Sequence, residues 1–142
     1  METEKLNLKR DLTTYSTVWE TMFSTINIDL INADNFDTEA NVVTARENIT
    51  GIEAFKAYSN NYLIGFSDAE MIILSSFGEG DNLVKHLQFK GTHDGELVGI
   101  TAWNNKVDIS GVTLVTMKNG KILKEQDFFD NLSFLTQLVV IK

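Results

Sequence analysis

Asp130 is the carboxylate whose neighbours in the sequence best suit proton transfer. It follows the aromatic residues Phe128 and Phe129 and precedes the apolar segment 132–135. A carboxyl group in apolar company is suited to general acid/base chemistry. The alternative is that Asp130 caps the N-terminus of a closing helix through its side chain. The sequence leaves both interpretations open.

The segment before Asp130 alternates as a β-strand does, with successive side chains on opposite faces. One face would carry Ile122, Lys124, Gln126, Phe128 and Asp130, and the other Leu123, Glu125, Asp127 and Phe129. The pattern therefore predicts that Gln126 and Phe128 lie on the same face as Asp130.

Tyr15 and Trp19 stand one helical turn apart on an apolar stripe. They could close a pocket with the Tyr15 hydroxyl aimed inward, although such a stripe is more often plain core. Tyr15 together with Asp37 would also imitate the hydroxyl and carboxylate of an isomerase.

The two histidines, His86 and His93, are seven residues apart on one predicted strand. An odd spacing directs them to opposite faces unless a bulge, for which Gly91 is a candidate, intervenes. The chain has no cysteine, which excludes a thiolate nucleophile and a cysteine zinc site. We therefore expect no metal site.

Composition restricts the class of protein. Of the 142 residues, 43% are apolar, which suits one domain over residues 1–142 and excludes a disordered chain. The net charge of −8 repels phosphate backbones and anionic lipid, so nucleic acid and membranes are not expected partners. The N-terminus lacks the pattern of a signal peptide, which predicts a cytoplasmic protein.

The spacing of apolar residues changes along the chain. Helical spacing predicts helices over 11–23 and 52–65, the second with Thr50 as N-cap and Glu53 in a capping box. A short strand is predicted over 40–43. Strands are then predicted over about 71–77, 82–92, 107–118 and 121–130, with Asn119-Gly120 as a hairpin turn and a closing helix over 131–138. Helices followed by antiparallel strands predict an α+β fold, a curved sheet with helices on one face.

Several segments occur together in a recognisable order. They are Ile49-Thr50-Gly51-Ile52-Glu53-Ala54-Phe55, Gly91-Thr92-His93-Asp94-Gly95, Asn119-Gly120-Lys121-Ile122, Phe129-Asp130-Asn131-Leu132 and Gln137-Leu138. With these segments, most of the chain resembles the SnoaL-like polyketide cyclase (ester cyclase) family of the nuclear transport factor 2-like superfamily.

The resemblance implies a cone-shaped, cystatin-like α+β barrel with a deep apolar pocket, forming a homodimer through the outer face of the sheet. It implies a cofactor-free intramolecular aldol condensation of a small hydrophobic carbonyl compound. Asp130 matches the family's acid/base, which removes a proton from an acidic methylene and returns it to the attacked carbonyl oxygen. The pocket residues expected with it are Tyr15, Trp19, His86, Gln88, His93, Gln126 and Phe128.

This sequence departs from the family pattern at three positions. Gln126 stands where relatives often carry Trp, Lys124 where they carry Glu, and His86 where many carry Arg. The superfold hosts isomerases, hydrolases, cyclases and non-catalytic binders, so these departures bear on the reaction rather than the fold. Two alternatives stand beside the cyclase: a non-catalytic ligand-binding or dimerisation module, and an isomerase or epoxide hydrolase-like enzyme.

Overall fold

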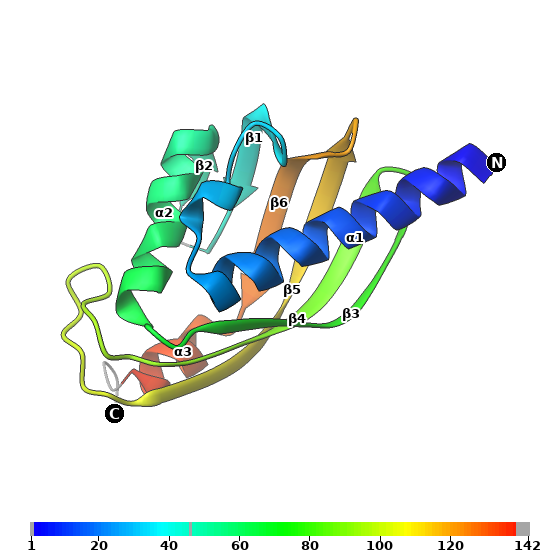
Figure 1. Cartoon of the computed structure of the whole chain (residues 1–142). Coiled ribbons are helices and arrows are strands. Elements are labelled where there is room, and N and C mark those ends of the chain that lie inside the picture. Colours follow the sequence, from blue (N-terminus) through cyan, green and yellow to red (C-terminus); the bar gives the residue numbers. More distant parts are fainter. Residues whose placement is uncertain (1, 46, 139–142) are drawn as a thin grey trace.

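A curved six-stranded sheet wraps around two long helices in the computed structural model, which describes residues 2–45 and 47–138 (Figure 1). The helices are α1 (Glu2–Thr25), α2 (Ile52–Gly65) and α3 (Asn131–Gln137), and η1 (Ile28–Leu30) is a short 3-10 turn. The strands are β1 (Phe36–Val43), β2 (Asn48–Thr50), β3 (Glu70–Glu79), β4 (Asn82–Thr92), β5 (Lys106–Lys118) and β6 (Lys121–Phe129). The predicted α+β fold is confirmed.

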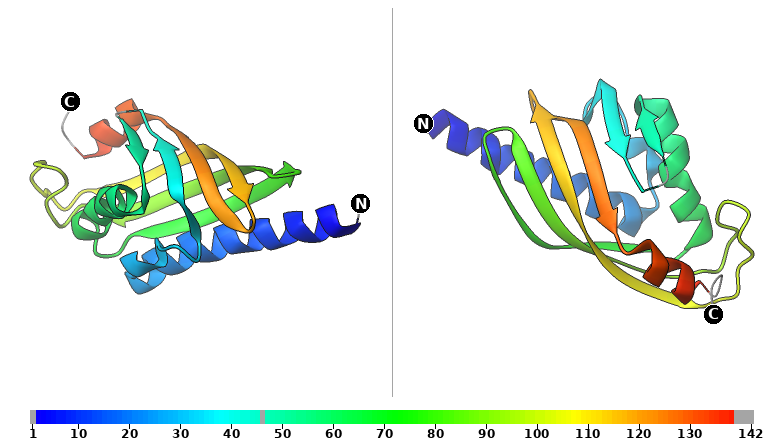
Figure 2. Two further views of the ribbon diagram at one scale, coloured as in Figure 1. Left: turned by 90° about the horizontal axis from the view of Figure 1, so that it is seen from above. Right: turned by 180° about the vertical axis from the view of Figure 1, so that it is seen from behind.

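The strands lie in the order β2-β1-β6-β5-β4-β3 across the sheet (Figure 2). From β3 to β6 each strand runs antiparallel to the next, as predicted. β1 lies parallel to β6, and β2 pairs with β1 antiparallel. Only residues 40–43 are predicted as strand in this region, because the first half of β1 carries Asp37 and Glu39 rather than alternating apolar side chains. The sheet is therefore wider than its four predicted long strands.

The core lies between the concave face of the sheet and the inner faces of α1 and α2. The buried aromatic residues of these helices include Tyr15, Trp19 and Phe23 from α1 and Phe55 from α2. They belong to the apolar stripes from which the helices over 11–23 and 52–65 are predicted. α1 begins at Glu2 rather than at the predicted residue 11. Its first turns consist mostly of polar helix-forming residues, so they form helix without the apolar stripe on which the prediction depends. These turns extend beyond the sheet (Figure 1).

The predicted hairpin turn is present, whereas the predicted N-cap of α2 is not. Asn119 and Gly120 both have positive φ, 52° and 80°, as a two-residue type I′ hairpin requires, so this prediction is confirmed. The predicted N-cap of α2 is wrong, because Thr50 pairs with Asn41 at the end of β2. Gly51 precedes α2 instead, with φ 93° and no side-chain capping hydrogen bond. Glycine adopts this backbone conformation without steric cost.

A bulge near Leu123 determines which residues of β6 face inward. The pairing of β6 with β5 shifts between Ile122 and Lys124. Ile122 is buried in the core, Lys124 is exposed, and Glu125 is buried again. The prediction that Ile122 shares a face with Lys124 is therefore wrong. Beyond the bulge, the inward face of β6 is that of Glu125 and Asp127.

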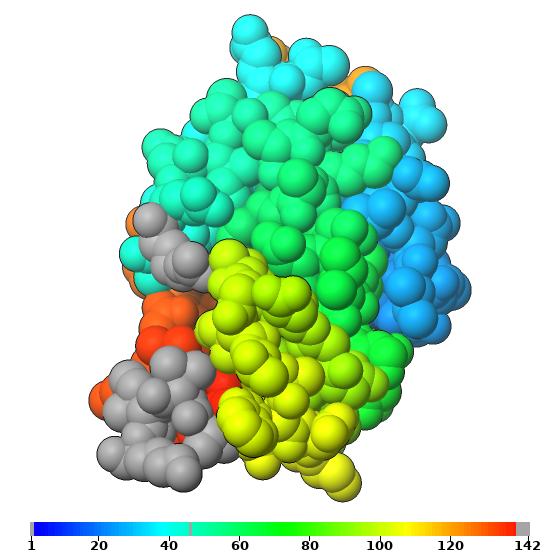
Figure 3. Space-filling view, turned by 90° about the vertical axis from the view of Figure 1, so that its left-hand side faces the viewer, coloured from blue at the N-terminus to red at the C-terminus, as the bar shows by residue number. Residues whose placement is uncertain are grey.

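The loop over residues 93–105 covers one end of the molecule, beside α2 and α3 (Figure 3). The backbone N–H groups of Asp94 and Gly95 both donate to the carbonyl oxygen of Gly65, at 3.1 Å. This close approach needs glycine at 95, where a Cβ would collide with the backbone oxygen of Ile64.

None of the helices in the described part of the chain is long and apolar enough to cross a membrane.

Candidate functional site

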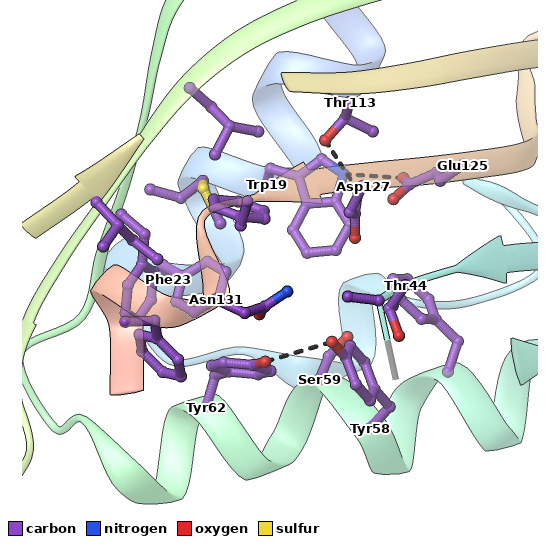
Figure 4. A pocket seen from close by; sticks show the side chains of 18 of the residues that line it. Trp19, Phe23, Thr44, Tyr58, Ser59, Tyr62, Thr113, Glu125, Asp127 and Asn131 are labelled. Carbon is purple, nitrogen blue, oxygen red and sulfur yellow. Dashed lines mark hydrogen bonds between the residues drawn. The ribbon is translucent and has the colours of Figure 1, made fainter. Parts of the chain in front are cut away.

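A cavity of about 110 Å³ lies between the concave face of the sheet, α1 and α2 (Figure 4). Aromatic side chains form much of its wall, with Trp19 and Phe55 packed edge to face at a ring distance of 5.6 Å. Its polar lining residues are Thr44, Ser59, Thr113, Glu125, Asp127 and Asn131, together with the tyrosines 15, 58 and 62. The cavity therefore combines apolar walls with a few converging polar groups, which is typical of a small-molecule site.

Asp127 is the carboxylate that points into this space (Figure 4). In the antiparallel register of β5 and β6 it lies directly opposite Thr113. The Thr113 hydroxyl donates to Asp127 Oδ1 at 2.9 Å. Burial raises the pKa of Asp127 to about 6. Such a carboxyl group exists in both protonation states near neutral pH, as general acid/base catalysis requires.

Glu125 stands two residues earlier, on the same face of β6, and is only 1% exposed. Its Oε1 accepts a hydrogen bond from Trp19 Nε1–H at 3.2 Å, and the side chain is also hydrogen-bonded to Tyr15. Burial, and then the neighbouring Asp127, raise the pKa of Glu125 well above its usual value. Two residues of α1 therefore hold Glu125 in place.

The wall opposite Asp127 carries hydroxyl and amide groups. Tyr58 and Tyr62 lie one turn apart on α2, with their hydroxyl oxygens 3.3 Å from each other. Burial raises the pKa of Tyr58, so its hydroxyl stays protonated at neutral pH. Asn131, the first residue of α3, directs its amide into the same space (Figure 4). These groups can donate hydrogen bonds to the carbonyl oxygens of a bound molecule.

Asp130 lies outside the cavity. It is exposed, and its Oδ1 accepts the backbone N–H of Ser133 at 3.0 Å as the N-cap of α3. The helix-cap interpretation of Asp130 is confirmed, and its expected place in the pocket is wrong. The reason is that β6 ends at Phe129, where the chain leaves the sheet and turns into α3.

Four other residues expected in the pocket, His86, Gln88, Gln126 and Phe128, are not among those that line the cavity. They occupy the positions of β4 and β6 that alternate with inward residues, so they face the convex side of the sheet. Phe128 is 51% exposed, and Gln88 donates to Asp108 Oδ1 at 2.7 Å. Their expected place in the pocket is therefore wrong.

His93 is fully buried, but at the start of the 93–105 loop rather than in the cavity. Its ring packs on Phe66 at 5.5 Å, and neither ring nitrogen has a hydrogen-bond partner in the structure. The expected pocket role of His93 is wrong. The pairing of β4 with β5 runs without a shift through Gly91, so the bulge considered there does not form. The described residues contain no cluster of three side chains suited to hold a metal ion.

Tyr15 and Trp19 both line the cavity, where the sequence places them. Asp37 does not join Tyr15, because it lies near the start of β1, where its Oδ1 accepts the backbone N–H of Glu39 at 2.9 Å. The hydroxyl and carboxylate pair considered for an isomerase is therefore not formed by these two residues.

Sequence reasoning did not select the carboxylates of the cavity, Glu125 and Asp127. The alternation of the last strand does group them on one face, together with Phe129. A second signal was the spacing of Tyr58 and Tyr62, one turn apart on the predicted helix 52–65. The two signals together point to a sheet face and a helix face that meet, which is where the cavity lies.

The chain matches one protein family and resembles several solved structures. The model of the SnoaL-like polyketide cyclase family matches residues 12–138. A protein from Jannaschia sp. CCS1, provisionally assigned as a SnoaL-like polyketide cyclase, is 21% identical over 94% of each chain, with a TM-score of 0.84. IdmH of Streptomyces antibioticus, provisionally assigned as a polyketide cyclase, is 16% identical over 91% of this chain and 98% of its own, with a TM-score of 0.76.

A third solved structure has a similar fold and a different provisional assignment. AclR of Streptomyces galilaeus, provisionally assigned as a hydroxylase, is 16% identical over 94% of this chain and 98% of its own, with a TM-score of 0.79. No curated protein matches the sequence. The family model nevertheless covers most of the chain, and the protein belongs to the SnoaL-like polyketide cyclase family.

Proposed function

We propose that the protein is a cyclase in which Asp127 acts as the general acid and base on a small, largely apolar carbonyl compound. The observation that carries the proposal is the position of Asp127. Its carboxyl group lies in an aromatic-walled cavity, is held through one oxygen by Thr113, and has its pKa raised to about 6 by burial. Membership of the family supports the type of reaction, and this geometry supports the choice of residue.

The proposed reaction begins when the Asp127 carboxylate removes a proton from a carbon atom flanked by two carbonyl groups. The electron pair of that C–H bond becomes an enolate delocalised over both carbonyls. The enolate carbon then forms a C–C bond with a further carbonyl carbon of the same molecule, whose oxygen takes the C=O electron pair. Asp127 returns its proton to this oxygen, which completes the ring and restores the carboxylate.

The groups opposite Asp127 are suited to hold the substrate during this transfer. Within the Tyr58–Tyr62 pair one hydroxyl donates to the other, so the pair can present one hydroxyl donor, and Asn131 its amide, to the space that Asp127 faces. Donors that are fixed before the reaction stabilise negative charge as it develops on a carbonyl oxygen. We assign these three residues to substrate orientation and Asp127 to proton transfer.

The first step can be tested without knowing the natural substrate. We would follow exchange of the α-proton of a β-keto ester for deuterium by proton NMR, with and without protein. Asp127→Asn keeps the shape of the side chain but cannot take up the proton, so the protein-dependent rate should fall by about 10²–10⁴-fold.

The matched control is Asp130→Asn, because asparagine also caps helices and the residue lies outside the cavity. This variant should exchange at the wild-type rate. A wild-type rate in Asp127→Asn would refute the proposal. Binding of the ester without protein-dependent exchange would instead favour the non-catalytic ligand-binding module.

A further inference from the structure

Lys85 is a fully buried lysine on the inward side of β4, and the proposed reaction does not use it. Its Nζ donates to Ser16 Oγ at 2.7 Å and lies 4.1 Å from the centre of the Tyr15 ring. Within residues 2–45 and 47–138, no carboxylate oxygen lies in salt-bridge contact with this amine. Its charge is therefore balanced through space rather than by a direct ion pair.

Tyr15 connects Lys85 to the carboxylates of the cavity. The ammonium group lies over the Tyr15 ring, and the Tyr15 hydroxyl is hydrogen-bonded to Glu125. Glu125 is fixed further by Trp19. A continuous buried contact thus runs from β4 through α1 to the acidic face of β6.

The cavity wall has no positive charge of its own. Its described lining residues include the carboxylates Glu125 and Asp127 but no lysine, arginine or histidine. A buried carboxylate without a nearby cation holds its proton more tightly. Lys85 attracts Glu125 electrostatically from behind Tyr15 and is the cation placed to counter this effect.

The charged and titratable groups around these side chains are few. Lys85 faces Tyr15 and Glu20 of α1 and Glu125 of β6. Asp127 faces Glu125 on its own strand, Tyr15 of α1 and Tyr58 of α2. Burial lowers the pKa of Lys85 to about 8, so the amine is still protonated at neutral pH.

We propose that Lys85 is a positioning residue for the carboxylate pair, because its ammonium group supplies, from behind Tyr15, the positive charge that sets the pH range over which Glu125, the partner of Asp127, takes up and loses its proton. Its consequence for catalysis rests on the proposed function. Its effect on the protonation of the pair is a property of the free protein and can be measured separately.

The test is a ¹³C NMR titration of the aspartate and glutamate carboxyl carbons in the wild type and in Lys85→Met. Removal of a nearby positive charge favours the protonated carboxyl group, so the titration midpoint of Glu125, the carboxylate that Lys85 attracts, should move upward by about one pH unit. Lys85→Gln, which is neutral but can still bond to Ser16, should show the same shift and serves if Lys85→Met does not fold.

Two lysine variants are the controls. Lys85→Arg keeps the positive charge and should restore the wild-type midpoint. Lys124→Met removes a lysine that precedes Glu125 in sequence but is exposed, where solvent and salt screen its charge. This variant should leave both the midpoint and the exchange profile unchanged.

The outcomes separate this inference from the proposed function. An unshifted Glu125 midpoint in folded Lys85→Met or Lys85→Gln overturns the role of Lys85, even if the wild type catalyses exchange. A shifted midpoint in a protein without exchange activity supports the role of Lys85 and refutes the proposed function. A shift of the same size in Lys124→Met would also overturn the inference, because it would show that burial behind Tyr15 has no special effect.

Discussion

Glu125 and Asp127 both lie on the inward face of β6, but their surroundings suit them to different roles. Glu125 is bound by Trp19 and Tyr15 and has almost no exposed surface. Asp127 has Thr113 as its hydroxyl partner and points into the cavity. A group that must meet a substrate needs this access, so the proton transfer is assigned to Asp127.

Asp127→Asn should raise the stability of the protein at alkaline pH. The pKa of Asp127 is about 6 in the folded protein against an ordinary value of 3.8, so the folded state binds this proton more tightly than the unfolded state. Stability therefore falls as the pH rises from about 4 to about 6 and stays lower above that range. At pH 8 the uncharged asparagine should recover about 1–3 kcal/mol of unfolding free energy.

This stability effect is checked by urea unfolding of the wild type and Asp127→Asn at pH 8 and pH 4. The gain should be present at pH 8 and small at pH 4, where the wild-type carboxyl group is already protonated. Destabilisation of equal size at both pH values would contradict the burial of a charged Asp127.

The sequence predicts some of these residues and misses others for a definable reason. Tyr15 and Trp19 are predicted correctly as cavity residues because helical spacing places both on the buried face of α1. Asp130 is chosen instead of Asp127 because it follows two aromatic residues and matches the acid/base position of the family, whereas Asp127 follows the polar Glu125 and Gln126. The bulge near Leu123 and the end of β6 at Phe129 decide between the two faces, and alternation encodes neither.

At the scale of the elements, the β5–β6 hairpin places the acidic residues Glu125 and Asp127. The Asn119-Gly120 turn starts the pairing of the two strands, and the bulge near Leu123 then adjusts it so that Thr113 lies opposite Asp127. This turn, the long strands and the two main helices are predictable because each follows a local pattern. The parallel pairing of β1 with β6 is not, since it joins distant segments of the chain.

Gly111→Ala should disturb both this hairpin and the cavity. A Cβ at residue 111 would lie 2.6 Å from Cδ1 of Phe129 and 2.8 Å from the backbone oxygen of Phe128. The backbone cannot yield cheaply, so we expect a loss of about 1–3 kcal/mol in unfolding free energy. Because Phe129 lines the cavity, binding of a β-keto ester should weaken as well.

The neighbouring substitution Ser110→Ala is the control for Gly111→Ala. Ser110 is exposed in the same strand. Urea unfolding and ester titration followed by NMR should give wild-type values for Ser110→Ala. If Gly111→Ala also gives wild-type values, the close packing of Phe129 on β5 does not hold in solution.

At the scale of the whole molecule, the outer face of the sheet exposes apolar side chains on the side opposite the cavity. Phe77, Leu114 and Phe128 are 61%, 44% and 51% exposed. In the strand pairing, Phe77 and Leu114 both flank Val84, and Phe128 lies beside Val112. A contiguous apolar surface of this kind is typical of a protein interface.

We expect this outer face to form a homodimer. Light scattering after size-exclusion chromatography should give twice the chain mass of 16.0 kDa, and Leu114→Lys with Phe128→Lys should give the monomer mass. Leu132→Lys, an exposed leucine of α3, should leave the dimer intact. A wild-type mass of 16.0 kDa at micromolar concentration would contradict the dimer.

The most direct test of the central claim compares the titration of the Asp127 carboxyl group with the pH dependence of the exchange rate. The ¹³C signal of the Asp127 carboxyl carbon, assigned by its loss in Asp127→Asn, would be followed over pH in parallel with α-proton exchange of a β-keto ester. We predict that both curves have their midpoint at about pH 6, the pKa of this buried group. A carboxyl midpoint near 4, or an exchange rate that persists in Asp127→Asn with an unchanged profile, would contradict the account.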